Sequence, residues 1–139
     1  MSQIQTYLPF NVRAAAILTN AYVAGTIIGL PANFPDSGVH LNNQLGLYIF
    51  FTIGSLTDLL IKIEFSNDPA FAAGNTVQET SSVISAGIST DTNIVHKYTG
   101  SGNYRILMPI KDRYIRVSAE GEGTVTSSSL TITAIIGID

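Results

Sequence analysis

Few residues of this chain have the types and spacing that metal chemistry requires. The two histidines, His40 and His96, lie far apart in the sequence, and neither has an acidic neighbour at the spacing of metal ligands. A zinc site needs three or four converging ligands. A site here would need a carboxylate brought to both histidines by folding. Two separate histidines, one in a loop and one at a strand edge, explain the pattern better, so we expect no zinc site.

Acidic loops offer a second place where an ion could bind. Asn67-Asp68 and the segment 90–93 (Thr-Asp-Thr-Asn) present side-chain oxygens, and calcium takes six to eight oxygen ligands. Neither segment matches an EF-hand or a glycine-aspartate repeat. Because Asn and Asp in turns usually hydrogen-bond their own backbone, both segments are better interpreted as ordinary turns. We expect no metal and no other cofactor.

Nucleophiles and paired acids are equally incomplete. The densest serines, Ser127 to Ser129, lack the Gly-x-Ser-x-Gly pattern of a nucleophile elbow. Glu120 and Glu122 would share one face of a strand, whereas glycosidase acids flank the scissile bond across a cleft. The glycines at 100–102 and 121–123 do not lie between a strand and a helix start, where a phosphate-binding loop is found. The sequence therefore predicts no catalytic residues and no enzyme.

The composition indicates a protein that covers part of its surface with partners. Hydrophobic residues make up 45% of the chain and charged residues only 12%, against about 25% charged in typical domains. Because charge keeps free monomers apart in solution, a charge-poor apolar chain is expected to form a homo-oligomer or a larger assembly. The seven basic residues are scattered, whereas a nucleic-acid groove needs a basic stripe. We expect no nucleic-acid partner.

Two further absences narrow the setting. The chain has no cysteine, which excludes a disulfide framework and slightly favours assembly in a reducing cytoplasm. Its first ten residues lack the basic and apolar regions of a signal peptide. The longest apolar run, Leu45 to Ile53, is far shorter than the roughly 20 residues that cross a bilayer. We expect a soluble chain with no membrane partner.

The elements that would position any site follow from alternating patterns. Between Asp112 and Ile136, two runs in which every second residue is apolar are joined by small residues, which predicts a closing hairpin. Leu59 to Ser66 alternates in the same way. With turn signals at regular spacing, the chain predicts a single antiparallel β-sandwich or jelly roll of roughly eight strands. Residues 1–11 are expected to form an extended N-terminal arm, and residues 12–139 the sandwich.

Two other segments carry specific expectations. The run Leu45 to Ile53 is apolar on both faces, so it is either central in a sheet or has one face in a subunit contact. A hairpin turning about Asn20 is predicted between residues 12 and 30 because β-forming residues follow it and Gly25 opposes a helix. Arg113 and Arg116 lie beside acidic residues and are expected to form outward-facing or subunit-facing ion pairs.

Two segments resemble small virion proteins of tailed bacteriophages. Leu59 to Asp68 is similar to a strand that ends in a Phe-Ser-x-Asp turn, and residues 112–134 are similar to a Tyr-x-Arg-Val strand followed by a Gly/Ser/Thr-rich hairpin. The resemblance covers about the last 80 residues, and a Trp frequent after the turn is replaced here by Phe71. It implies a capsid decoration (cement) protein of the virion, assembled in the host cytoplasm.

The resemblance also implies partners. Such proteins bind the major capsid protein or another virion protein and often form trimers, and a terminal arm reaches a neighbour. Neck, tail or head-fibre components are an alternative within the particle. A module that binds carbohydrate or a host surface is a further alternative, weakened by the absence of Trp and kept open by the tyrosines. The candidate subunit-interface residues are Tyr7, Phe10, Tyr48, Phe50, Arg113 and Arg116.

Overall fold

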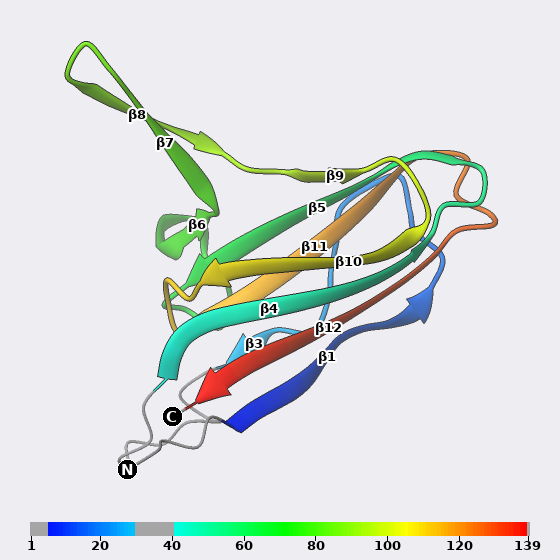
Figure 1. The fold of residues 1–139 in the computed structure, drawn as a ribbon, viewed down its shortest axis with the longest axis horizontal. Helices are drawn as coiled ribbons and strands as arrows, with labels where there is room; N and C mark the ends of the chain where they lie inside the picture. The colour runs from blue at the N-terminus through cyan, green and yellow to red at the C-terminus, as the bar shows by residue number, and fades with distance from the viewer. Residues whose placement is uncertain (1–5, 30–40, 139) are drawn as a thin grey trace.

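The computed structural model describes residues 6–29 and 41–138 and shows an all-β sandwich of two facing antiparallel sheets (Figure 1). This confirms the predicted fold class. Sheet A has the strand order β1-β12-β4-β10. Its strands are β1 (Thr6–Ala16), β12 (Ser129–Ile138), β4 (Leu41–Thr52) and β10 (Gly102–Pro109).

Sheet B has the order β2-β11-β5-β6, with β3 also paired to β11 and β9 to β5. Its strands are β2 (Val23–Ala24), β3 (Ile28–Gly29), β5 (Leu56–Ser66), β6 (Thr76–Gln78), β9 (His96–Tyr98) and β11 (Tyr114–Gly123). A single 3-10 turn, η1 (Ala73–Asn75), is the helical element of the described residues. These residues hold twelve strands rather than roughly eight, because strands of two or three residues are too short to show alternation.

The remaining two strands form a hairpin that projects from the sandwich (Figure 1). They are β7 (Thr80–Ser85) and β8 (Ile88–Asn93), paired only with each other within the described part of the chain. Residues 80–93 are called the projecting hairpin below. The structure places this hairpin outside both sheets.

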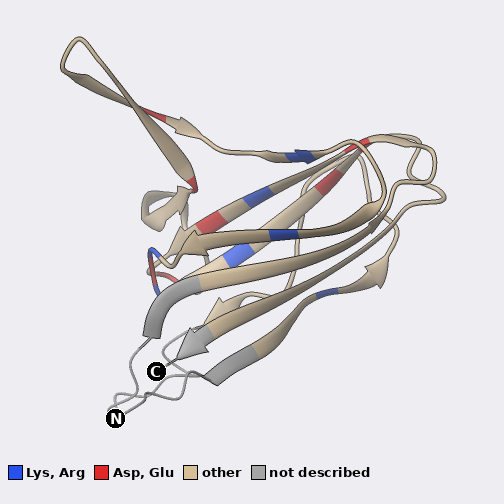
Figure 2. Ribbon diagram, in the orientation of Figure 1, with Lys and Arg blue, Asp and Glu red and all other residues tan. Residues whose placement is uncertain are grey.

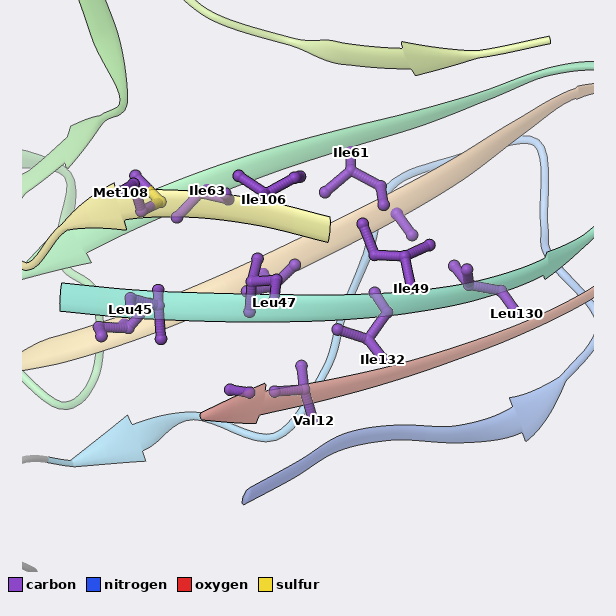
Figure 3. Close-up of a cluster of buried hydrophobic side chains, with 14 of the residues drawn as sticks. Val12, Leu45, Leu47, Ile49, Ile61, Ile63, Ile106, Met108, Leu130 and Ile132 are labelled. Carbon is purple, nitrogen blue, oxygen red and sulfur yellow. The ribbon is translucent and has the colours of Figure 1, made fainter. Parts of the chain in front are cut away.

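The core lies between the two sheets, as Figure 3 shows. Every second residue of β4 points inward from sheet A, and Leu45, Leu47 and Ile49 are fully buried. The predicted inward set of β5 is confirmed, since its members have no exposed surface. Each fully buried side chain of this size contributes about 1.5–3 kcal/mol. The inward residues of β5 are Leu59, Ile61, Ile63 and Phe65.

Both predicted hairpins are wrong in their pairing. The turn after Gly123 carries the chain from β11 in sheet B to β12 in sheet A, so these two strands face each other across the core. The turn at Asn20 likewise joins β1 in sheet A to β2 in sheet B. The Asn20 side chain fixes the crossing, because its Nδ2 donates to the carbonyl oxygens of Gly121 (3.1 Å) and Gly123 (2.9 Å).

The predicted N-terminal arm, residues 1–11, falls partly outside the described residues. From Thr6 onward the chain already belongs to β1, which pairs antiparallel with β12. Phe10 is opposite Ala134 and packs against the core. The strand continues through the predicted boundary between residues 11 and 12, so the described part of this segment is a sheet strand rather than a free arm.

Candidate functional site

The outer face of sheet A is the candidate site. β4 is central in this sheet, between β12 and β10, and two of its outward residues, Tyr48 and Phe50, are large aromatic side chains. Phe50 keeps 48% of its surface exposed, and Tyr48 is half-buried. The prediction of a central strand with an apolar outer side at Leu45 to Ile53 matches this arrangement. The sheet pairing therefore presents Tyr48 and Phe50 to the outside.

Gly46 flattens the face beside these two side chains. It faces outward and is nevertheless buried, because neighbouring side chains lie over it. A Cβ at this position would come 3.5 Å from Leu107 Cδ2 and 3.9 Å from Tyr48 Cε2. Leu107 is opposite Gly46 on β10 and is 59% exposed, while Ile135 is opposite it on β12 and half-buried. The result is a flat apolar strip across three strands.

Charge is almost absent from sheet A (Figure 2). Its four strands carry two charged residues, Arg13 and Arg105. Arg13 is turned onto the end of β1, where its guanidinium donates to the carbonyl oxygens of Leu130 (3.3 Å) and Ile17 (2.9 Å), and burial lowers its pKa. Arg105 lies over the ring of Tyr48, 5.9 Å from its centre. Arg105 is therefore the charge that lies beside Tyr48 on this face, on the outer strand β10.

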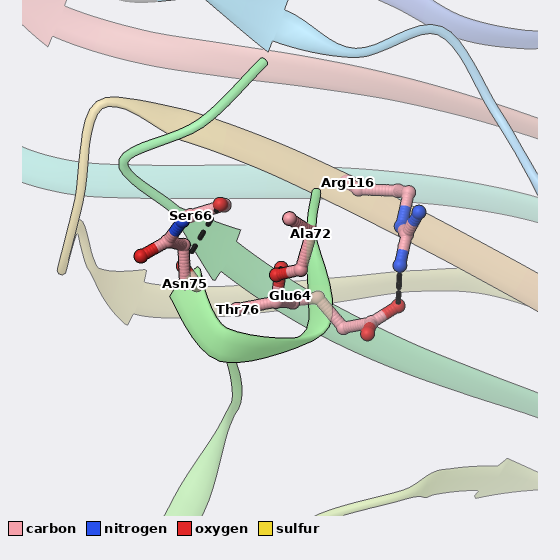
Figure 4. A network of polar contacts seen from close by, with 6 residues as sticks. All are labelled: Glu64, Ser66, Ala72, Asn75, Thr76 and Arg116. Carbon is pink, nitrogen blue, oxygen red and sulfur yellow. Dashed lines mark hydrogen bonds and ion pairs between the residues drawn. The ribbon is translucent and has the colours of Figure 1, made fainter. Parts of the chain in front are cut away.

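Sheet B has the opposite character, because it carries more charged residues and several of them are paired within the chain. Arg116 donates to Glu64 Oε1 at 3.1 Å, as Figure 4 shows, and Lys97 Nζ lies 3.3 Å from Asp58 Oδ2. Lys62 lies over an aromatic ring, 4.6 Å from the centre of Tyr22. A face covered by paired charges is well hydrated. Sheet B therefore has the more charged outer face, whereas the outward polar residues of sheet A, such as Asn103 and Thr131, are uncharged.

The loop after β5 explains the position of Arg116. Ser66 is fully buried, and its hydroxyl donates to the carbonyl oxygen of Asn75 at 2.8 Å (Figure 4). Asp68 accepts hydrogen bonds from backbone N–H groups within the same loop, as an Asx turn does. The loop places the ring of Phe71 4.5 Å from the Arg116 guanidinium. Arg116 is thereby engaged by its own chain, with its side chain 27% exposed.

The other predicted interface residues have different places. Arg113 is exposed beside β11, where its backbone N–H donates to Asp112 Oδ1 at 2.8 Å. Phe10 packs inward, as described above. Tyr7 is in β1, and its side chain lies outside what the structure describes. Of the six predicted residues, Tyr48 and Phe50 share the face. Leu107 was missed because it lies between the apolar residues Ile106 and Met108, so the sequence there does not show which side faces outward.

The structure describes one of the two histidines. His96 Nε2 lies 2.8 Å from Glu79 Oε2 at the root of the projecting hairpin, and His40 falls outside the described residues. In the part of the chain that the structure covers, no three His, Cys, Asp or Glu residues are grouped closely enough to hold a metal. The described residues also include no helix of the length and apolarity that a membrane crossing needs.

The projecting hairpin is a second unusual surface. Every residue from 81 to 93 is exposed, including Val83 (60%), Ile84 (77%) and Ile88 (66%). Its turn places Ala86 at φ 51° and Gly87 at φ 76°, the two positive values that a type I′ turn requires. The tip thus presents three large apolar side chains to solvent.

Comparison with known proteins adds little to this geometry. No protein-family model matches the chain, and no curated protein matches it. Among solved structures, a chain of "Structure of infectious bursal disease virus Gx strain" is similar over 99% of this chain, with 12% identity and a TM-score of 0.32. This chain spans 41% of the length of that one. A TM-score of this size does not establish a shared fold.

Proposed function

We propose that this chain is a structural protein of a tailed-bacteriophage particle, a capsid decoration (cement) protein that binds the shell as a homo-oligomer. The observation that carries the proposal is the flat, nearly uncharged outer face of sheet A, with Phe50 and Leu107 exposed. Contiguous apolar surface on a soluble chain marks a contact with another protein. The resemblance of the last 80 residues to small virion proteins supplies the class of particle.

The fold suits such a role mechanically. Two sheets closed over one core make a rigid plate, and the two outer faces differ in charge. Sheet A covers a neighbouring subunit, while the paired charges of sheet B face water. A standard interface buries about 800 Å² on each partner, roughly a tenth of the 7745 Å² accessible on this chain. At about 25 cal/mol per Å² of apolar surface, a contact of this size clamps neighbouring subunits together without any catalytic step.

A glycan-binding module is the competing proposal, and it depends on aromatic rings open to a sugar. Tyr98 and Tyr104 are the aromatic pair of the described residues, with ring centres 4.2 Å apart. They stack on each other, and both pack against the core. The Tyr104 hydroxyl donates to the carbonyl oxygen of Gly100. Rings that are already stacked and hydrogen-bonded within the chain favour a structural role for this pair.

Quantitative mass spectrometry of density-purified particles tests the proposal. A decoration protein is expected in a copy number comparable to that of the major capsid protein. A copy number of a few per particle would instead identify a neck, tail or head-fibre component. Absence of the chain from purified particles would contradict a virion role altogether.

A binding assay identifies the face that attaches. Phe50→Asp is expected to abolish co-sedimentation of the purified protein with undecorated capsids, because it places a charge on the outer face of sheet A and so disrupts the oligomer that binds the shell. The matched control is Val77→Asp on β6 of sheet B, since Val77 is also apolar and 56% exposed. Equal loss with both variants would show that the sheet A face has no special role.

A further inference from the structure

The projecting hairpin is too exposed to be explained by its own chain. It lies outside both sheets and points away from the sandwich (Figure 1). An isolated two-stranded hairpin is marginally stable in water, and this one exposes Val83, Ile84 and Ile88 at its tip. Exposed β-branched residues on an unpaired ribbon are an aggregation hazard unless a partner covers them. The tip therefore requires a partner surface.

Several hydrogen bonds at the root of the hairpin fix its direction. The Ile94 N–H donates to the Glu79 carbonyl oxygen at 2.8 Å, and the Gln78 side chain donates to the Ile94 carbonyl oxygen at 3.0 Å. The Glu79 N–H donates in turn to the carbonyl oxygen of Ile63 in sheet B, at 2.8 Å. The side chains of His96 and Glu79 also contact each other at this point, with Nε2 and Oε2 2.8 Å apart. The hairpin is thus anchored to sheet B and held in one direction.

One face of the projecting hairpin carries an apolar group and a charge at a fixed spacing. Ser82 is opposite Asp91 and Ile84 is opposite Ser89, so Ile84 and Asp91 share a face and lie two residue levels apart. That spacing is about 7 Å along the ribbon. Asp91 is the only charged residue between Thr80 and Asn93. The face therefore presents one large apolar side chain and one carboxylate.

The outer face of sheet A carries the matching pair. Arg105 and Leu107 lie two residues apart on β10, on the same outward side, which again is about 7 Å. Arg105 is the one charged residue of β10, and its sign is opposite to that of Asp91. β10 is the edge strand of sheet A. A hairpin from another copy can therefore approach it from the side without meeting another strand of that sheet.

We propose that the projecting hairpin of one copy lies across the β10 side of sheet A of a second copy, with Ile84 against Leu107 and Asp91 beside Arg105. This inference rests on the homo-oligomer of the proposed function and names the contact that builds it. The two surfaces are different parts of the chain, so each copy gives one hairpin and receives one. Such a heterologous contact is satisfied at every copy when it closes into a ring.

Cysteine cross-linking tests the contact without background, because the chain has no cysteine. An equimolar mixture of the single variants Ile84→Cys and Leu107→Cys is expected to form a mixed disulfide dimer under mild oxidation. A disulfide forms only when the two Cα atoms approach within about 7 Å. The control replaces Ile84→Cys with Thr92→Cys, an exposed residue on the opposite face of the hairpin. No mixed dimer, or as much of it with the control, would overturn the proposal.

Charge exchange is the second arm of the test. Asp91→Lys is expected to raise the dissociation constant of the oligomer about tenfold, because repulsion replaces attraction. The double variant Asp91→Arg with Arg105→Asp is expected to restore association, while Thr92→Lys should leave it unchanged. Failure of the double variant to restore association would overturn the contact.

The outcomes for the hairpin contact and for the proposed function are distinguishable. If Phe50→Asp dissociates the oligomer while Ile84→Asp and Asp91→Lys leave it intact, the hairpin contact is wrong and the sheet A interface stands. If the wild-type chain is a monomer that binds capsids, the hairpin contact and the homo-oligomer are both wrong, and only attachment to the capsid stands.

Discussion

Phe50 and Phe51 are neighbours on β4 that point to opposite sides of sheet A. Replacing each of them with alanine therefore distinguishes the outer face of the sheet from the core. Phe51 points inward and is 4% exposed, whereas Phe50 points outward and is 48% exposed. Phe51→Ala removes a buried ring and is expected to cost about 3–5 kcal/mol of unfolding free energy. The Phe50 side chain is only about half buried, so Phe50→Ala is expected to lower the unfolding free energy by about 1 kcal/mol.

Urea unfolding of dilute protein measures both losses. For a denaturant slope of about 2 kcal/mol/M, Phe51→Ala lowers the midpoint by about 2 M and Phe50→Ala by about 0.5 M. The second half of the assay varies the protein concentration. Association stabilises the folded state by mass action, so the wild-type midpoint should rise with concentration. Phe50→Ala should remove this rise, and Phe51→Ala should keep it.

The pair of results can refute the face assignment. Equal losses at low concentration would place both rings in the core, and a concentration dependence that survives Phe50→Ala would remove this residue from the interface.

Three further predictions concern stability within the chain. Ser66→Ala should lower the unfolding free energy in urea by about 1–3 kcal/mol, because the buried hydroxyl donates to the Asn75 carbonyl oxygen and accepts from the Asp68 N–H. An unchanged free energy would mean that the loop does not depend on these two hydrogen bonds. Arg116→Ala should cost only about 1 kcal/mol or less, since its ion pair is partly exposed to solvent, and a loss of several kcal/mol would contradict this. Burial, with smaller contributions from neighbouring tyrosine and glutamate groups, raises the pKa of Tyr98 above its usual 10.0, so its contribution to stability is complete below pH 10 and is lost as the pH rises through the folded-state pKa. Tyr98→Phe should therefore flatten the alkaline fall in stability, and an unchanged slope would contradict the assignment.

The buried faces were predictable from the sequence, but the strand pairing was not. The alternation of Ile61 and Ile63 with Lys62 reports which side of a strand meets the core, and the structure bears it out. The same signal says nothing about which strand lies alongside. The turns at Asn20 and after Gly123 look like hairpin turns in the sequence, yet each carries the chain across the sandwich. Crossing turns depend on contacts far away in the sequence.

The candidate site was predictable in part for the same reason. Tyr48 and Phe50 belong to one doubly apolar run, which local pattern can detect. The partner of Arg116 is Glu64, 52 residues away, and the sequence suggested acidic neighbours closer along the chain instead. Leu107 joins the face only because β10 pairs with β4. Long-range pairing thus decides which charges are neutralised and which apolar side chains form one surface.

Sedimentation equilibrium of the wild-type chain beside Phe50→Asp tests the central claim, that the outer face of sheet A is buried in a homo-oligomer. We expect a defined oligomer for the wild type, a folded monomer for Phe50→Asp, and an unchanged oligomer for the control Val77→Asp on sheet B. A wild-type chain that stays monomeric and soluble at high concentration, or an oligomer that Phe50→Asp leaves intact, would contradict it.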